Sequence, residues 1–213
     1  YIKHKKILMD INDLLQGPAK DIILSQFGQQ LGLGDKAQTN TAVDGILATL
    51  LNGVAKNAST QEGQDGLLSA LDRDHDGSIF DDLGGFLSGV VQPSNPNTAN
   101  GTGILNHILG DKQGNAINSI SKASGIDVGS ITTMMTSLAP VVLGMLGKAK
   151  ATQTANQNAG SILDIITGAT QTINQQPTTQ SIFTKLLDKD GDGSVMDDLT
   201  QMGMGSILGK FFG

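Results

Sequence analysis

The amino-acid sequence predicts an all-α fold, a helical bundle of two related lobes. Apolar residues recur at helical spacing over most of the 213 residues, and the alternation typical of strands is absent. The order of elements in the first half of the chain is repeated in the second half. With 38% hydrophobic and 16% charged residues the chain can bury a sizeable core. Because it has six Phe, one Tyr and no Trp, that core must be mainly aliphatic.

The first lobe is predicted over residues 9–91, with residues 1–8 as an upstream or added extension before Met9. Pro18 suits the first turn of one helix, and Asp35 suits the cap of a longer one. The apolar residues that give these two helices their spacing are Ile22, Ile23, Phe27, Val43, Ile46, Leu47, Leu50, Leu51 and Val54. A short helix, an acidic loop and an exit helix follow, over residues 67–71, 72–82 and 83–90.

The second lobe is predicted over residues 104–213, after a polar linker at 92–103. A helix ends near Gly125, and Asp127 suits the cap of a longer helix. Its apolar residues at helical spacing are Ile131, Met134, Met135, Leu138, Val141, Val142 and Met145. Polar connections, a short helix, a second acidic loop and an exit helix complete the lobe, over residues 150–160, 171–180, 182–187, 188–198 and 199–208.

Two acidic segments have nearly the same sequence. Residues 72–83 read DRDHDGSIFDDL and residues 188–199 read DKDGDGSVMDDL, so eight of twelve positions are identical across a separation of 116 residues. Closely spaced carboxylates repel one another unless a cation lies among them, and an oxygen donor set favours Ca²⁺ over Zn²⁺ or copper. A single copy is also found in Asp-Gly surface turns, where Asp bonds its own backbone and Gly takes positive φ. The repetition therefore predicts two calcium sites.

The spacing within each segment is that of a shortened EF-hand or dockerin-type loop. An EF-hand loop supplies oxygens from positions 1, 3 and 5, a carbonyl at 7 and an acidic side chain at 12, with Gly at 6. Here position 12 is Leu, and the closing carboxylate comes one residue early. Asp81 and Asp197 are alternatives as ligands or as caps of the exit helices. The predicted ligands are Asp72, Asp74, Asp76, Ser78 and Asp82, and Asp188, Asp190, Asp192, Ser194 and Asp198.

The shortened ending should weaken calcium binding. Asp closes the loop where sensor proteins use the longer Glu, so we expect a dissociation constant of roughly 10⁻⁵ to 10⁻³ M. Two calcium ions would cancel much of the formal net charge of -6. We expect calcium to stabilise the fold without opening it as in a sensor.

Several phrases of the sequence resemble one bacterial family. They are GILATLL at 45–51, AKNAST at 55–60, LDRDHDGS at 71–78, the apolar segment 138–147 and the terminal acidic loop. Together they resemble the YidB-like family, domain of unknown function 937, in its Bacteroidetes-type form, from Met9 to the C-terminus. The resemblance implies an all-helical fold and a bacterial source, and it brings no catalytic residues.

The resemblance also implies helical folds of the homeodomain type, which raises a DNA-binding alternative. Residues 117–131 read like a helix-turn-helix, with Gly125 at the turn. A recognition helix from Asp127 would carry no Lys or Arg before Lys148, so it has no source of phosphate neutralisation. We therefore expect no nucleic-acid partner.

No set of residues predicts catalysis. The chain has no Cys, and its only Glu is Glu62. None of the three histidines, His4, His75 and His107, stands beside a candidate nucleophile in the sequence, and we expect His75 to face solvent. The prediction is a protein that is not an enzyme.

The predicted function is that of a calcium-binding structural or interaction protein, with a protein partner or a homo-oligomer possible through Gly/Ala/Leu-rich helix faces. A secreted or cargo-type protein folded by extracellular calcium is the alternative. The longest apolar segment, residues 138–147, is shorter than the roughly 20 residues of a membrane span. With no signal-peptide core, the default expectation is a cytoplasmic location, with export by a non-standard route left open.

Overall fold

The computed structural model describes residues 11–155 and 162–179. This part of the chain forms nine α-helices and three 3-10 helices and contains no strand, which confirms the all-α class. The elements are α1 (Ile11–Gln16), α2 (Pro18–Gln30), α3 (Lys36–Asn57), α4 (Gln61–Asp74), η1 (Ser78–Asp82), α5 (Leu83–Leu87), η2 (Pro96–Ala99), α6 (Gly101–Leu109), η3 (Gly110–Lys112), α7 (Gln113–Ser124), α8 (Val128–Ala155) and α9 (Ile162–Asn174).

The helix starts follow from local chemistry. Pro18 is the first residue of α2, where its missing N–H costs nothing. Asp35 caps α3 by accepting hydrogen bonds from the backbone N–H groups of Ala37 and Gln38, at 2.8 and 3.2 Å. Asp127 accepts one from the Ser130 N–H at 3.0 Å, in the first turn of α8. The three predicted starts are confirmed.

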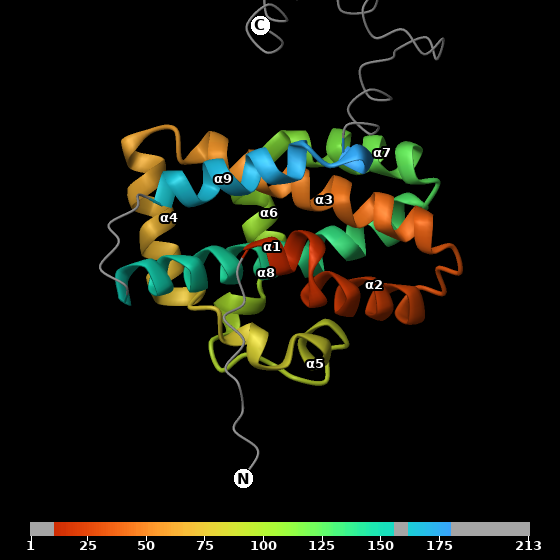
Figure 1. Cartoon of the computed structure of the whole chain (residues 1–213), viewed down its shortest axis with the longest axis horizontal. Coiled ribbons are helices and arrows are strands. Elements are labelled where there is room, and N and C mark those ends of the chain that lie inside the picture. Colours follow the sequence, from red (N-terminus) through yellow and green to blue (C-terminus); the bar gives the residue numbers. More distant parts are fainter. Residues whose placement is uncertain (1–10, 156–161, 180–213) are drawn as a thin grey trace, which may run out of the picture.

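The helices pack around α3 and α8. Figure 1 shows α9 lying along α3, and α4 crossing one end of the bundle. Helix α3, from the predicted first lobe, contacts α7, α8 and α9 of the predicted second lobe. The buried apolar residues of all these helices form one hydrophobic cluster. The described parts of the two predicted lobes therefore share one core, and the division into lobes stays a prediction.

The core is aliphatic, as the composition requires. Phe27 is the only aromatic residue among the buried apolar side chains of the described chain. On α3, Ile46, Leu47 and Leu50 are completely buried, and Met134 and Leu138 are completely buried on α8. Each such side chain contributes roughly 1.5–3 kcal/mol by leaving water. The two long helices thus supply the centre of the fold.

Helices α6 and α8 meet where α8 lacks one of its own hydrogen bonds. Pro140 lies inside α8 and has no N–H to donate to the Thr136 carbonyl one turn earlier. Gly101, the first residue of α6, lies directly against that carbonyl, and a Cβ at this position would overlap its oxygen. Glycine therefore permits the close approach of the two helices.

Segments predicted as polar connections are partly helical. Residues 92–103 contain η2 and the start of α6, α8 continues to Ala155, and α9 extends to Asn174. The prediction relied on polar composition, but Asn residues here act as helix caps: Asn95 and Asn100 accept backbone N–H groups at 3.0 Å. The predicted extension at 1–8 and the second acidic loop and its two flanking helices lie outside the described residues.

Helix α8 is longer and more continuously apolar than the sequence prediction assumed. Its segment Val128–Thr152 is long and apolar enough to cross a membrane, by length and composition alone. In the fold, 61% of its most apolar window is buried among the other helices. A core helix that is apolar on most sides has this property without a membrane.

Candidate metal centre

The first acidic segment forms a tight turn between two helices. Asp72 and Asp74 lie in the last turn of α4, η1 covers Ser78–Asp82, and α5 begins at Leu83. Gly77, between them, has a φ of 89°, which a residue with a side chain rarely adopts. An EF-hand loop needs its sharp turn at the corresponding position.

Asp74 is the most enclosed of the predicted ligands in the first segment, with 7% of its surface exposed. Its Oδ2 accepts hydrogen bonds from Arg73 Nε at 2.9 Å and Nη2 at 2.7 Å, and its Oδ1 accepts one from Asn95 Nδ2 at 2.9 Å and one from Asn97 Nδ2 at 3.3 Å. The Arg73 guanidinium and the Asn95 amide hold the pKa of this carboxyl well below its usual range. The Asp74 carbonyl also accepts a hydrogen bond from Thr98 Oγ1 at 2.5 Å.

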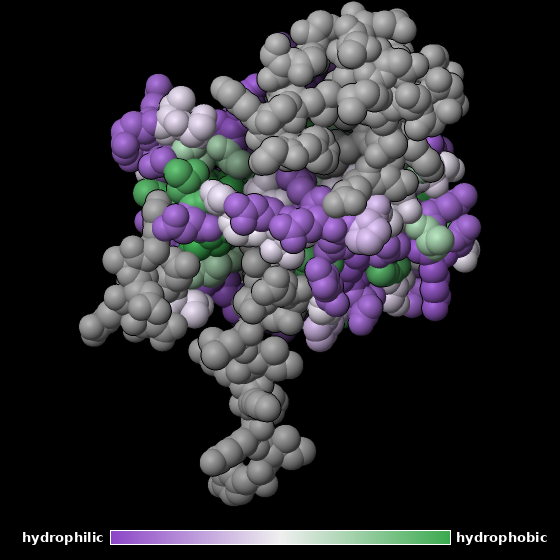
Figure 2. Space-filling view, turned by 45° about the horizontal axis from the view of Figure 1, so that its top comes forward, coloured by the Kyte–Doolittle hydropathy of each residue, from purple (hydrophilic) through white to green (hydrophobic). Residues whose placement is uncertain are grey.

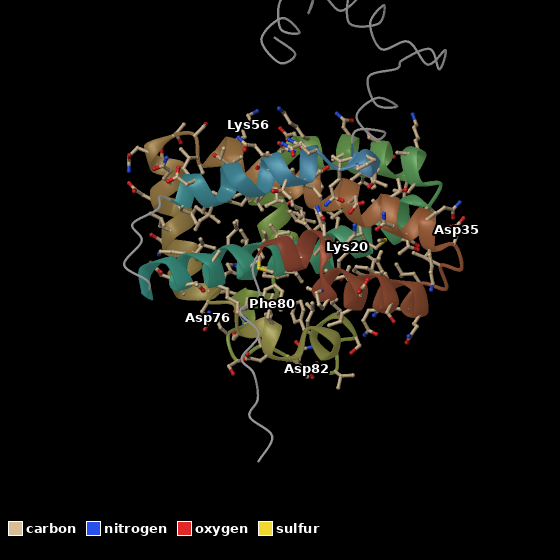
Figure 3. All side chains as sticks on the ribbon, in the orientation of Figure 1. Lys20, Asp35, Lys56, Asp76, Phe80 and Asp82 are labelled. Carbon is tan, nitrogen blue, oxygen red and sulfur yellow. The ribbon has the colours of Figure 1, made fainter. Side chains whose placement is uncertain are left out.

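The other predicted carboxylates have separate partners. Asp72 pairs with Lys150 Nζ of α8 at 2.5 Å. Asp76 accepts the Ser78 N–H at 2.9 Å, and this bond lowers the pKa of Asp76. Asp82 accepts the Gly85 N–H at 2.8 Å and thereby caps α5. Figure 3 shows Asp76, Phe80 and Asp82 along the lower edge of the molecule.

These partners keep the carboxylates from converging. Within the residues that the structure describes, no group of three or more His, Asp or Glu side chains could hold a metal ion as placed. The second predicted set, Asp188 to Asp198, lies outside these residues. The calcium sites therefore stay a prediction, and the structure shows what Ca²⁺ would have to displace in the first loop.

The acidic segment is docked tightly onto α8. Ile79 is 5% exposed and lies over Gly144, where a Cβ would be 2.9 Å from the Ile79 Cδ1 atom. One turn further along, a Cβ on Gly147 would overlap the His75 carbonyl oxygen. Lys148 Nζ lies 5.6 Å from the centre of the Phe80 ring, in a cation–π contact. Two glycines of α8 thus form the surface on which the loop rests.

The model of a family described as a bacterial protein of unknown function, DUF937, matches residues 13–149. The chain belongs to this family. The matched residues include the first acidic loop, the helices on both sides of it and most of α8. No curated protein and no solved structure matches the chain.

His75 of this DUF937 protein corrects one sequence prediction. It was expected to face solvent, but only 3% of its surface is exposed. The reason is that α4 extends to Asp74, so the turn that follows is directed against Gly147 of α8. Burial lowers the pKa of His75, and its Nδ1 finds no hydrogen-bond partner within the described residues.

A second buried carboxylate of this DUF937 protein was missed by sequence reasoning. Asp44 is completely buried on α3, and its Oδ1 lies 2.6 Å from Lys20 Nζ of α2, which Figure 3 labels. Its Oδ2 accepts hydrogen bonds from Thr178 Oγ1 at 2.6 Å and Asn40 Nδ2 at 3.1 Å. The available signal was an acidic residue next to Val43 within an apolar helix pattern. These contacts join α2, α3 and the segment after α9.

Helices α7 and α8 of this DUF937 protein are joined by a short turn at the place where the sequence reads like a helix-turn-helix. Gly125, with a φ of 74°, ends α7, and α8 begins three residues later. The first two turns of α8, VGSITTM, contain no Lys or Arg, and the Asp127 carboxylate stands at its start. The expected absence of a nucleic-acid partner remains a prediction, and this charge distribution supports it.

Proposed function

We propose that this DUF937 protein is a calcium-binding structural or interaction protein, in which Ca²⁺ bound at residues 72–82 and 188–198 stabilises the fold. The observation that carries the proposal is the repeated acidic segment, eight of whose twelve positions are identical between the copies. Its first copy has the glycine turn of a calcium loop and rests on the central helix α8. A cation bound in this loop would therefore stabilise the contact between the loop and the core helix α8.

The partners of the first loop are of the kind that a divalent cation can displace. Arg73 holds only Oδ2 of Asp74, and its side chain is 73% exposed, so solvent weakens this ion pair. Asn95 and Asn97 hold the other oxygen. Ca²⁺ would compete with Arg73 for Oδ2 while the two amides continue to orient the carboxylate.

The remaining ligands require rotation of exposed side chains. The Asp72 side chain is 69% exposed beside Lys150, and the exposed carboxylates of Asp76 and Asp82 accept the N–H groups of Ser78 and Gly85. We assign the Ser78 carbonyl to the backbone position of the loop. These groups lie on both sides of the buried Ile79 in the sequence. Their coordination by one ion would therefore hold the segment, with Ile79 at its centre, against α8.

The size of the stabilisation follows from linkage. A ligand that binds only the native state adds RT ln(1 + [L]/Kd), which is about 2.7 kcal/mol per site at 100 times Kd. Calcium that binds the folded protein without opening the helical bundle would add this free energy to the stability of the fold. A sensor would instead expose an apolar groove on binding.

Calorimetric titration of the chelator-treated full chain with Ca²⁺ tests the proposal. We expect about two ions per chain, with dissociation constants of roughly 10⁻⁵ to 10⁻³ M. Asp82→Ala should reduce affinity more than Asp81→Ala, because Asp82 is the proposed closing ligand. A stoichiometry of zero would overturn the proposal, and the reverse order of the two variants would move the closing ligand to Asp81.

A secreted or cargo-type role, folded by extracellular calcium, is the second candidate. It rests on the missing Glu at the twelfth position, since loops with a millimolar dissociation constant are filled outside cells and empty inside them. We further propose that the chain is a YidB-like, Bacteroidetes-type member of its family, works without catalysis, and uses a protein partner or a second copy rather than nucleic acid. A dissociation constant near 10⁻⁵ M would favour an intracellular protein over the secreted one.

A further inference from the structure

An open cleft of about 450 Å³ separates α4 from α6. Both helices pack on α8, and the two scarcely touch each other. Figure 2 shows hydrophobic surface exposed at the α4 end of the molecule. The small and aliphatic residues that line the cleft include Gly66, Leu67, Ala70, Ile104, Ile108 and Leu143. The cleft is therefore an apolar surface that the described residues leave partly exposed.

The edge of the cleft is polar and has hydrogen-bonding atoms to spare. Asn57 donates from Nδ2 to a carbonyl oxygen of α6 at 3.1 Å, and Asn97 donates from Nδ2 to Asp74 at 3.3 Å. Asn100 accepts the Gly103 N–H through its Oδ1 at 3.0 Å. The other amide atom of each Asn, two acceptors and one donor, remains for a partner outside the described residues. A polypeptide main chain carries both donors and acceptors and matches this edge.

Two cations stand together at one end of this edge. Lys56, labelled in Figure 3, precedes Asn57 at the end of α3, and Lys112 lies in η3, which follows α6. Contact with the Lys112 side chain lowers the pKa of Lys56. Neither lysine belongs to an ion pair of the described chain. Because neighbouring ammonium groups repel each other, an acidic group from another segment would stabilise both.

The first acidic segment shows how a segment of this kind docks. Ile79 lies over Gly144 of α8, and the Phe80 ring faces the Lys148 ammonium group. Two carboxylates, at positions 81–82, follow this apolar pair directly. The contact thus consists of a small helix residue under one apolar side chain and a cation beside the next. The cleft offers the same combination.

Three parts of the chain lie outside the described residues, and their composition differs. Residues 1–10 carry three Lys and one Asp, so the lysine pair would repel them. Residues 156–161 read NQNAGS and have neither a charge nor a large apolar side chain. Residues 180–213 contain the second acidic segment, in which Val195 and Met196 are followed by two Asp residues. Apolar and acidic character are combined in this part alone.

The second acidic segment can reach the cleft. Thr178 donates a hydrogen bond to Asp44 Oδ2, so the described chain ends beside α3. The rise of α3 from Asp44 to Asn57, at the edge of the cleft, is about 20 Å. Residues 180–195 can span up to about 50 Å when extended.

We propose that the second acidic segment, residues 188–199, docks in the cleft between α4 and α6, with its apolar pair against the two helices and the carboxylates that follow it beside Lys56 and Lys112. Gly66 and Ala70 of α4 provide the small residues under the apolar pair. The docking goes beyond the proposed calcium function and does not depend on it. All tests below are done in chelator, so that a failure of calcium binding leaves their outcome unchanged.

Disulfide formation in the full chain tests the docking directly, because the chain has no Cys. Gly66→Cys is combined with Val195→Cys, since a Cβ on Gly66 meets no atom within 4 Å. We expect a bond within one chain, formed at least about tenfold faster than when Val195→Cys is combined with Gly168→Cys or Gly114→Cys. These two control glycines are equally open, on α9 and α7, and do not line the cleft.

Two outcomes of the disulfide experiment overturn the proposal. Equal rates in the three cysteine pairs show that the segment has no preferred position on the bundle. A bond between two chains, at a rate that rises with protein concentration, assigns the cleft to a second copy instead.

Charge reversal tests the lysine pair. In the cleft cysteine pair at low salt, Lys56→Glu with Lys112→Glu should slow bond formation about fivefold, an effect within reach of two exposed ion pairs. Asp197→Lys with Asp198→Lys should then restore the rate. Lys122→Glu, at an exposed lysine of α7, serves as the control. An unchanged rate after reversal, or no restoration, overturns the contact with the lysines.

Hydrogen exchange of Val195→Asp tests the docking without cysteines. A charge on the docked side chain should release the segment, so the amides of α4 should exchange about tenfold faster while those of α7 are unchanged. Val195→Ile is the matched variant, because Ile stands at the corresponding position of the first segment, and it should keep the protection. Unchanged exchange of α4 in Val195→Asp overturns the docking, even where a cysteine variant does not fold.

Discussion

Two buried carboxylates of this protein, Asp44 and Asp74, have similar burial and different environments. Asp44 lies within α3, and one of its partners is the ammonium group of Lys20, itself nearly buried. Asp74 lies at the end of α4, and its charged partner, Arg73, is mostly exposed. At Asp44, the buried Lys20 ammonium occupies the position that another cation would need. At Asp74, neutral Asn side chains hold the carboxylate in place, and the exposed Arg73 guanidinium can be replaced by another cation.

This difference separates a structural charge from a candidate ligand. A buried ion pair holds its members because either one alone would be an uncompensated charge. An exposed guanidinium contributes little to an ion pair and is readily exchanged. The comparison therefore predicts that perturbing Asp44 affects stability with or without calcium, and that perturbing Asp74 affects the calcium response.

The largest effect is expected from Lys20→Met. It leaves the Asp44 carboxylate buried with the neutral partners Thr178 and Asn40 among the described residues, and the free energy of unfolding should fall by about 3–5 kcal/mol. Denaturant unfolding with calcium and with chelator should give the same loss. Lys36→Met, at the exposed start of α3, serves as the control. A loss confined to the calcium-free protein would contradict the assignment of a purely structural pair.

The next effect is expected from Gly147→Ala. A Cβ at this position overlaps the His75 carbonyl, which is backbone and cannot rotate away, so the acidic segment must move off α8. Both the melting temperature and calcium affinity should fall. Gly144→Ala is the matched variant, because its Cβ meets side-chain atoms and no backbone: Ile79 Cδ1 at 2.9 Å, Ile79 Cγ1 at 3.1 Å and Phe80 Cε2 at 3.5 Å. Equal effects of the two variants on calcium affinity would contradict the docking argument.

Asp74→Asn should have a smaller effect on stability and a specific effect on calcium binding. The amide keeps the shape of the side chain but cannot pair with Arg73 or supply a charged ligand. We expect a moderate decrease in melting temperature in chelator, and calorimetry should show the loss of one of the two calcium ions. Retention of both ions would remove Asp74 from the ligand set.

The sequence predicted the helical class, the caps at Asp35 and Asp127 and the glycine turn at Gly77, because each depends on local chemistry. It could not predict that Asp44 meets Lys20 or that His75 is buried, since both depend on contacts between segments far apart in the chain. The same holds for the candidate ligands. The spacing of the carboxylates singled them out as candidate ligands. The side chains that hold them apart, such as Lys150 and Asn95, lie far away in the sequence and could not be predicted.

The smallest effect is expected at Asp127, as a dependence on pH. Its hydrogen bonds with the Ser130 hydroxyl and N–H lower the pKa of this carboxyl. A lowered pKa contributes stability above the unfolded value of about 3.9, and this contribution is lost as pH falls through the folded value. Asp127→Asn keeps a capping oxygen and removes the titration, so its melting temperature should fall less steeply below about pH 4. Identical acid profiles for the two proteins would contradict this cap.

The central claim is that calcium stabilises this fold through its acidic segments. Melting of the full chain at increasing Ca²⁺, with Mg²⁺ as the control ion and a hydrophobic dye as a second readout, tests it most directly. At 100 times Kd, stabilisation of about 2.7 kcal/mol per site should raise the melting temperature by roughly 5–10 °C per site, with no increase in dye binding below the transition. An unchanged melting temperature, or dye binding that rises with calcium while the fold is intact, would contradict the claim.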